Sequence, residues 1–300
     1  MDKLFDYNLT NLTASYTGKP KVLVIPGCRS SNKNICQLYD VKRNQWRNHP
    51  FPFINWTSPH NIFVYHKNLY LLNIFYPTLK VWSLNVKKIQ YYNYLINPDI
   101  QYINISVLFD DRIYIFSHQQ KTIMLYLDNT ISHTSLESIF LNGADNYWAF
   151  SERIDSYIYI FRKKENICND ILQYNPQRDI FYHTSFKTPV LMLPSLTTSN
   201  NVLYVSGGKT QQHVLSSSLI RWDPRCKKID KCKSMYYPRW SHRMEKIEDY
   251  SLIVIGGSTC HNHFSSISNG EIYDIRTNKW RVVSNMNYPE QIFGSTVIWH

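Results

Sequence analysis

Six short runs of apolar residues recur along the chain at nearly constant spacing. Each run is rich in β-branched and aromatic residues, as is typical of β-strands. Aligned on the position that ends the run, the equivalent residues are Pro26, Asn73, Ser117, Arg162, Gly207 and Gly256. The intervals between them are 47, 44, 45, 45 and 49 residues. A repeat of this length predicts an array of similar structural units.

A second marker follows most of these runs. It consists of an aromatic residue and a large apolar or aromatic residue seven positions later. Five of the six units contain this pair, namely Tyr39 and Trp46, Trp82 and Ile89, Tyr174 and Phe181, Trp222 and Ile229, and Tyr273 and Trp280. The third unit shows only Tyr126, so we expect it to be the least regular unit.

Together the two markers predict one four-stranded antiparallel sheet per unit. Strand a is the apolar run, strand b ends at the aromatic residue, strand c starts seven residues later, and strand d precedes the next unit, as at 61–66. We expect strand a to lie nearest the axis, where glycine lets backbones approach. The last strand d, at 295–300, should complete the sixth sheet. One such sheet cannot bury its face alone, so the units must stack in a ring.

The glycine pair after strand a, the Tyr-Asp turn and the Trp seven residues on resemble the kelch repeat. The resemblance covers about Lys21 to His300 and is most specific in the first, fifth and sixth units. It implies an all-β fold, a six-bladed kelch-type β-propeller over 21–300, with blades starting near 21, 68, 112, 157, 202 and 251. Residues 1–20 are expected to form a leader or linker. A composition heavy in Ile, Asn, Tyr and Lys further resembles the C-terminal kelch half of poxvirus BTB-kelch proteins.

Charge and hydropathy restrict the partners. The 33 basic and 22 acidic residues give a formal charge of +11, which suits an acidic partner or merely keeps the surface soluble. The longest basic run, Arg162-Lys163-Lys164, has only three residues, so nucleic acid is not the expected partner. No stretch reaches 18 uninterrupted apolar residues and the N-terminus is no signal peptide, so we expect a cytoplasmic protein without a membrane partner.

Known catalytic and metal-binding motifs are missing from the sequence. There is no phosphate-binding glycine loop, no nucleophile elbow and no C-x-x-C pair among the six cysteines. The Cys260–His263 stretch, CHNH, is expected to be a turn rather than a metal site. The acidic pairs Asp110-Asp111 and Glu248-Asp249 are expected in the turns between strands d and a. We therefore expect no enzyme activity, no cofactor and no metal.

The kelch resemblance implies a protein-protein interaction module. In a BTB-kelch ubiquitin-ligase adaptor it would recognise the substrate, and it would reach a cullin scaffold only if a BTB domain lies upstream. A viral host-interaction protein is the related possibility. Two alternatives stay open, namely a basic propeller that binds nucleic acid or an acidic glycan, and a metal-dependent propeller enzyme.

The same resemblance points to the a–b loops and the c–d loops at one end of the ring as the partner-binding face. An extended acidic protein segment is the expected ligand, with Arg29 able to pair with a carboxylate in bidentate geometry. Trp240 has two readings, as a contact residue or as a side chain buried between blades. The candidate contact residues are Arg29, Ser58, Tyr102, His118, Tyr147, Lys163, Lys164, Lys209, Trp240, Ser241, His261 and Gln291.

Overall fold

The computed structural model describes most of the strands and the loops of the C-terminal third. The described residues are 20–25, 35–50, 60–65, 68–73, 78–83, 89–95, 103–110, 112–117, 122–126, 131–134, 150–164, 168–188, 191–210, 212–260, 266–289 and 294–299. They form strands and turns but no helix. None of the described segments is a helix that could span a membrane.

The described strands form six four-stranded antiparallel sheets. The first three contain β24 (Gly294–Trp299), β1 (Pro20–Ile25), β2 (Ile35–Asp40) and β3 (Gln45–Pro50); β4 (His60–Tyr65), β5 (Asn68–Asn73), β6 (Thr78–Ser83) and β7 (Ile89–Leu95); β8 (Ile103–Phe109), β9 (Arg112–Ser117), β10 (Thr122–Tyr126) and β11 (Ile131–Thr134). The others contain β12 (Phe150–Ile154), β13 (Tyr157–Lys164), β14 (Cys168–Asn175) and β15 (Ile180–Thr188); β16 (Ser195–Ser199), β17 (Val202–Ser206), β18 (Leu219–Asp223) and β19 (Lys228–Lys231); β20 (Arg243–Glu248), β21 (Ser251–Ile255), β22 (Gly270–Asp274) and β23 (Lys279–Val283).

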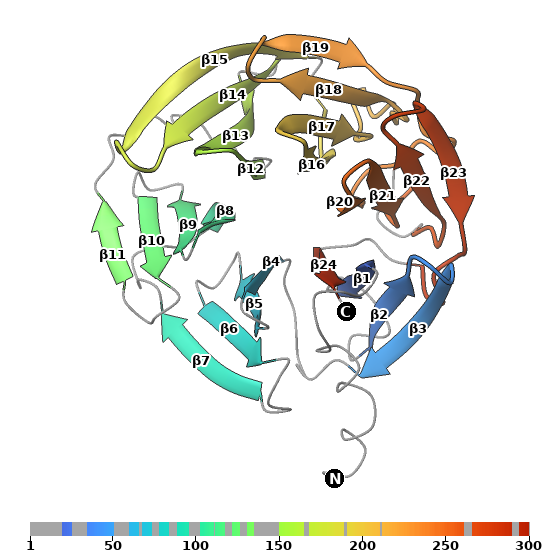
Figure 1. Ribbon diagram of the computed structural model, residues 1–300, viewed down its shortest axis with the longest axis horizontal. Helices are drawn as coiled ribbons and strands as arrows, with labels where there is room; N and C mark the ends of the chain where they lie inside the picture. Colours follow the sequence, from blue (N-terminus) through green and yellow to red (C-terminus); the bar gives the residue numbers. More distant parts are fainter. Residues whose placement is uncertain are drawn as a thin grey trace.

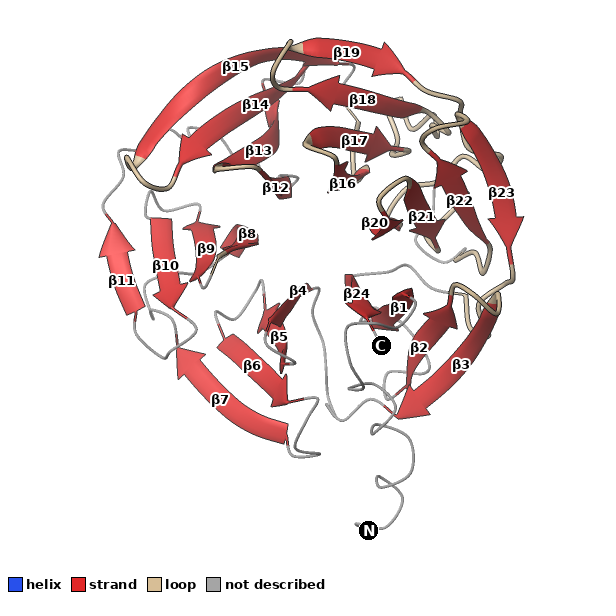
Figure 2. Ribbon diagram, viewed as in Figure 1, coloured by secondary structure: helices blue, strands red, loops and turns tan. Residues whose placement is uncertain are grey.

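The six sheets stand side by side around a common axis, each running outward from an inner to an outer strand (Figure 1). Figure 2 shows the same ring built of strands and connecting loops. The described strands form a β-propeller of four-stranded antiparallel blades, so the predicted fold class is confirmed, and the six described sheets are consistent with the six predicted blades. The predicted blade starts coincide with β1, β5, β9, β13, β17 and β21.

The identity of the innermost strand differs from the prediction. β4, β8, β12, β16, β20 and β24 lie nearest the axis (Figure 1), and these are the strands d, not the strands a. Strand d pairs with the strand a that follows it, because only two residues separate them in five blades. Such connections close a tight hairpin. Three of these turns contain residues with positive φ, namely Asp110 (55°), Asp155 (54°), and Asn200 (52°) with Asn201 (60°).

The ring closes through the two ends of the chain. β24 pairs with β1 from Pro20 opposite Trp299 to Ile25 opposite Gly294. The prediction that β24 completes the sixth blade is therefore wrong, because β24 supplies the inner strand of the first blade. The third blade also has four strands. Register shifts interrupt the strand pairing in four of the described sheets, and the third blade is one of the four. Its register therefore does not distinguish it from the second, fourth and sixth blades.

The seven-residue pairs are direct cross-strand partners on strands b and c. Tyr39 lies opposite Trp46, and the other four predicted pairs repeat this register. In the first blade the two rings are 5.0 Å apart between centroids. The Tyr39 hydroxyl also donates to Asn44 Oδ1 at 2.7 Å, and Asn44 has a φ of 52°. The same tyrosine-to-turn bond occurs in the fourth and sixth blades, at Tyr174–Asp179 and Tyr273–Asn278.

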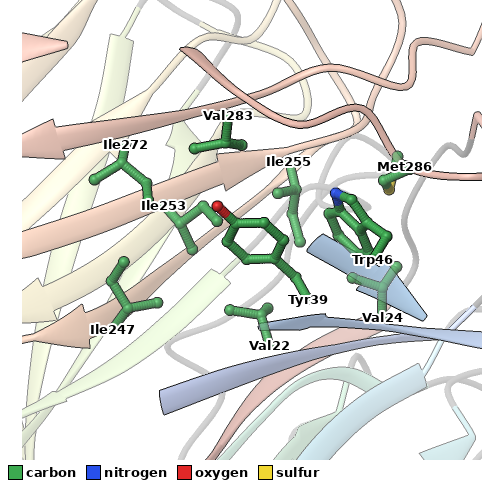
Figure 3. Close-up of a cluster of buried hydrophobic side chains, with 10 residues drawn as sticks. All are labelled: Val22, Val24, Tyr39, Trp46, Ile247, Ile253, Ile255, Ile272, Val283 and Met286. Atoms are coloured by element: carbon green, nitrogen blue, oxygen red, sulfur yellow. The ribbon is translucent and has the colours of Figure 1, made fainter. Parts of the chain in front are cut away.

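Adjacent blades are joined by apolar clusters. Figure 3 shows one, in which Tyr39 and Trp46 of the first blade pack against side chains of the sixth. The sixth-blade residues of this cluster are Ile247, Ile253, Ile255, Ile272, Val283 and Met286. Large aromatic rings between blades provide the buried area that a single sheet lacks.

Candidate loop face between the fifth and sixth blades

Two segments build the best-described part of the predicted binding end. One is the a–b loop that follows β17, at 207–218, and the other is the c–d linker between β19 and β20, at 232–242. The linker lies on the loop through backbone bonds from Met235 N to Ser217 O (2.9 Å) and from Arg239 N to Ser216 O (3.1 Å). These bonds give the loop face a defined backbone.

The glycine pairs make this close approach possible. Gly207 and Gly208 have φ values of 59° and 91°, and the Gly208 amide donates to Arg239 O at 2.8 Å. A Cβ on Gly207 would lie 2.5 Å from Arg239 O, which no side chain tolerates. Gly257 in the sixth blade, with a φ of 92°, is similarly tight against Trp240 O. Glycine therefore allows close backbone approach as predicted, but against the c–d linker rather than at the axis.

A buried ion pair between Arg239 and Glu271 holds the linker against β22 of the sixth blade. Arg239 Nη2 lies 2.8 Å from Glu271 Oε1, and both side chains are fully buried. Glu271 also accepts the backbone amides of Tyr236 (2.7 Å) and Tyr237 (3.2 Å). Burial lowers the pKa of Arg239, and the neighbouring Glu271 carboxylate opposes that shift. The carboxylate thus joins β22 to the linker and sets the positions of the two tyrosines.

Lys209 and Trp240 belong to the interior rather than to the exposed face. Trp240 is 1% exposed, its indole N–H donates to Cys260 O at 2.9 Å, and the Lys209 ammonium lies 3.6 Å from its ring centroid. Lys209 is itself only 6% exposed, and burial lowers its pKa. The reading of Trp240 as a buried residue is therefore the right one. The placement of Lys209 as an exposed cation at the mouth is wrong, because the ring of Trp240 covers it.

Three apolar side chains of the two segments remain exposed. Val214 is 61% exposed at the tip of the a–b loop, and Tyr236 and Tyr237 of the linker are 62% and 40% exposed. We call these three residues the apolar loop patch. The loop tip is ordered by bonds between Thr210 and Val214 in both directions, at 2.9 and 3.2 Å. Exposed aromatic and aliphatic groups on fixed backbone are typical of recognition surfaces.

Ser206 and His242 lie next to each other beneath this face. Their Oγ and Nε2 atoms are 2.8 Å apart, and both residues are almost completely buried. Burial lowers the pKa of His242 well below its usual value, and the nearby Arg239 adds to the shift. A nucleophilic serine must reach a substrate, and this one cannot. The pair is a packing contact of the fifth and sixth blades.

A second group of ionisable residues lies at the inner strands. Glu152 of β12, Arg243 and Glu245 of β20 and Ser295 of β24 come from three blades. Burial, and then the charge of Glu245, raise the pKa of Glu152 to about 8. Burial also raises the pKa of Glu245 to about 7, against the opposing hydrogen bond from Ser295 and the charge of Arg243. The described residues contain no group of three possible metal ligands.

The remaining predicted contact residues lie in a strand, in the linker or outside the described part of the chain. Lys163 and Lys164 were placed in an a–b loop, but they lie in β13 and pair with Asn169 and Cys168, so the strand extends beyond the predicted turn. Ser241 lies in the linker with a φ of 54°. Seven residues lie outside the described part of the chain, namely Arg29, Ser58, Tyr102, His118, Tyr147, His261 and Gln291.

The residues of the apolar loop patch and Glu271 were not among the predicted contact residues. Tyr236 and Tyr237 precede Pro238, and a proline indicates a loop rather than the middle of a sheet, so the two rings could have been assigned to the linker. Glu271 occurs two residues before Tyr273, as Gln37 occurs two residues before Tyr39. Gln37 likewise bonds the linker of the preceding blade, through Tyr288 O and N at 2.9 and 3.0 Å. That recurrence is the signal that could have found Glu271.

Comparisons with known proteins agree with this architecture. The Kelch motif matches residues 249–287, which contain β21, β22 and β23. The chain is a β-propeller that carries a kelch motif. A solved structure titled "Structure of YjhT" aligns over 65% of this chain and 69% of that chain, with 14% sequence identity and a TM-score of 0.52. At that identity the likeness shows the fold alone. No curated protein matches the sequence significantly.

Proposed function

We propose that this propeller is a protein-recognition module that binds its partner through the apolar loop patch. The observation that carries the proposal is the exposure of Val214, Tyr236 and Tyr237 on segments held by backbone bonds and by the buried Arg239–Glu271 pair. A fixed backbone lowers the entropy that binding must overcome. Tyrosine is enriched among the residues that dominate interface energies.

The partner's expected chemistry is an extended protein segment with apolar anchors and acidic flanks. Its apolar side chains would pack on Tyr236 and Tyr237, and its carboxylates would face the exposed Lys233 of the same linker. The net charge of +11 supports the acidic preference through faster encounter. The proposal includes no catalytic step.

The kelch resemblance adds a finer role to this proposal. As the recognition arm of a cytoplasmic BTB-kelch ubiquitin-ligase adaptor, the propeller would select the substrate, and in a viral protein it would select a host target. Contact with a cullin is expected only through an upstream BTB domain. Purified propeller should therefore not retain a cullin in a co-purification, and retention would contradict this part of the proposal.

The test is a comparison of two double variants. Partners captured by the wild-type protein from lysate are identified, produced separately and titrated against each protein. Val214→Asp/Tyr237→Ala should weaken binding by at least about tenfold. The control, Ile180→Asp/Tyr182→Ala, removes a similar pair of exposed apolar groups from β15 of the fourth blade and should leave the affinity unchanged. Equal affinities for both variants would move the binding site away from the loop face.

A further inference from the structure

The outer strands of three consecutive blades carry exposed basic residues that are scattered in the sequence. In the order of the ring these strands are β19, β23 and β3, at the periphery of the propeller (Figure 1). The exposed cations on or beside them include Lys227, Lys231, Lys233, Lys279, Lys42 and Arg47, which we call the basic band. None of the six forms an ion pair with another described residue.

Backbone and side-chain contacts make the band continuous from blade to blade. Lys233, just after β19, donates its amide to Asn278 Oδ1 at 2.8 Å and accepts the Trp280 indole N–H at 2.6 Å. Ser284, just after β23, repeats both contacts with Asn44 (2.9 Å) and Trp46 (2.8 Å). Each outer strand therefore ends against the turn that begins the next one. The three strands together run for about 50 Å at the rise of a β-strand.

The acidic residues near the basic band already form ion pairs or hydrogen bonds with residues outside the band. Asp223 pairs with Arg225 at 2.7 Å, and Asp230 contacts Arg221 and Lys228 at 3.0 Å each. Asp40 and Asp274 have their partners in their own turns, with Oδ1 of each accepting backbone amides there. These carboxylates therefore neutralise the charges of nearby arginines and of Lys228. No carboxylate of the described residues neutralises the charges of the six band residues.

Exposed apolar groups lie on two of these outer strands and in one turn of the sixth blade. Ile229 of β19 is 37% exposed and Val282 of β23 is 48% exposed. Tyr250, in the turn between β20 and β21, is also exposed, and its ring lies 5.0 Å from the guanidinium of Arg276, which is in the turn before β23. A duplex needs charge but no apolar surface, whereas the bases of a single strand stack on apolar and aromatic faces. A flexible strand can also follow a rim that curves away from a rigid duplex.

We propose that the basic band binds single-stranded nucleic acid along the outer rim of the fifth, sixth and first blades. The lysines and arginine contact phosphates, and Ile229, Val282 and Tyr250 contact bases. The band adjoins the apolar loop patch at Lys233, and the Tyr236 hydroxyl donates to Trp280 O of β23 at 3.2 Å, but Val214, Tyr236 and Tyr237 are not members of the band. The band escapes a search for basic runs because its members lie in three sequence segments that meet only in the ring.

Fluorescence anisotropy with a labelled oligothymidylate of about 20 nucleotides tests the proposal, at salt concentrations from low to physiological. With six phosphate contacts, the logarithm of the affinity should fall with the logarithm of salt concentration at a slope of about −4. Lys231→Ala/Lys279→Ala should reduce that slope to about −3 and weaken binding about tenfold at low salt. Tyr250→Ala should weaken binding without changing the slope, because stacking releases no counterions.

The control variant, Arg178→Ala/Lys246→Ala, removes the same formal charge from outside the band. Arg178 lies in the turn before β15, and Lys246 lies in β20. This variant should keep wild-type affinity and slope. Equal losses in both double variants would show that only net charge matters and would overturn the proposal. So would the absence of binding, or binding of heparin or duplex DNA as tight as that of the oligothymidylate in the same buffer.

Discussion

The indole of Trp46 in the first blade donates its N–H to the backbone carbonyl of Ser284 in the sixth blade, at 2.8 Å. The two residues are 238 positions apart in the sequence. Asn44 reinforces the junction by accepting the Ser284 amide at 2.9 Å. This junction accompanies the pairing of β24 with β1, so ring closure has a strand component and an aromatic component.

Trp46→Ala should lower the free energy of unfolding by about 3–5 kcal/mol, because a buried ring between blades is lost. Trp46→Phe keeps most of the apolar contact and should cost about 1 kcal/mol for the missing hydrogen bond. Urea unfolding monitored by circular dichroism measures both. The matched control is Ile229→Ala at the equivalent position of the fifth blade, where the side chain is exposed and the cost should stay near 1 kcal/mol. A Trp46→Ala cost no larger than the control's would contradict the closure argument.

Glu271→Ala should destabilise the protein by about 3–5 kcal/mol, because it leaves the Arg239 guanidinium buried without its partner. It should also loosen Tyr236 and Tyr237, whose amides the carboxylate accepts. The exposed pair Arg221–Asp230 provides the comparison, since Asp230→Ala should cost less than about 1 kcal/mol. Thermal unfolding of both variants gives the two values, and similar values would remove the special role of the buried pair.

Lys209→Met should keep the melting temperature within a few degrees of the wild-type value, because the apolar side chain can still pack on Trp240. Lys209→Glu should unfold at a clearly lower temperature, since a buried carboxylate would face the indole ring of Trp240. Trp240→Ala should cost about 3–5 kcal/mol of stability for the lost ring. A Lys209→Glu protein as stable as the wild type, with only partner binding changed, would instead favour a surface role.

The raised pKa of Glu152 predicts that the stability of the folded protein decreases as pH rises. Its pKa is about 8 in the folded state and near 4.5 when unfolded, so the folded protein binds more protons between these values. Its contribution to stability therefore falls as pH rises through this window, and is most favourable below it. Glu152→Gln should be more stable than the wild type at pH 9 and should show a flatter profile from pH 5 to 9.

The comparison for this profile is Glu248→Gln, an exposed carboxylate at the end of β20. Unfolding in urea at each pH gives the two curves. Glu248→Gln should retain the wild-type slope, because Glu248 is exposed and the variant leaves Glu152 in place. Wild-type and Glu152→Gln curves that run parallel would show that Glu152 is ionised in the folded protein throughout the range.

Much of the architecture could be predicted from local sequence patterns. The seven-residue step between Tyr39 and Trp46 reports a tight turn and the register of two strands, which neighbouring residues control. The spacing of strand a reports the repeat, and the predicted blade starts all agree with the strands. These features depend on the alternation of apolar and polar residues, on turn residues and on contacts between residues less than ten positions apart. They can therefore be predicted from one sequence.

Contacts between blades could not be predicted from local sequence patterns. The sequence contains β24 and β1 but does not show that they pair across the ring, since closure depends on the shape of the whole array. The sequence predicts an exposed Lys209 because lysine is usually exposed, and only the packed position of Trp240 buries it. The basic residues of β19, β23 and β3 form one surface only because the ring places these strands end to end. Local sequence encodes each blade, whereas burial and surface charge are properties of how the blades assemble.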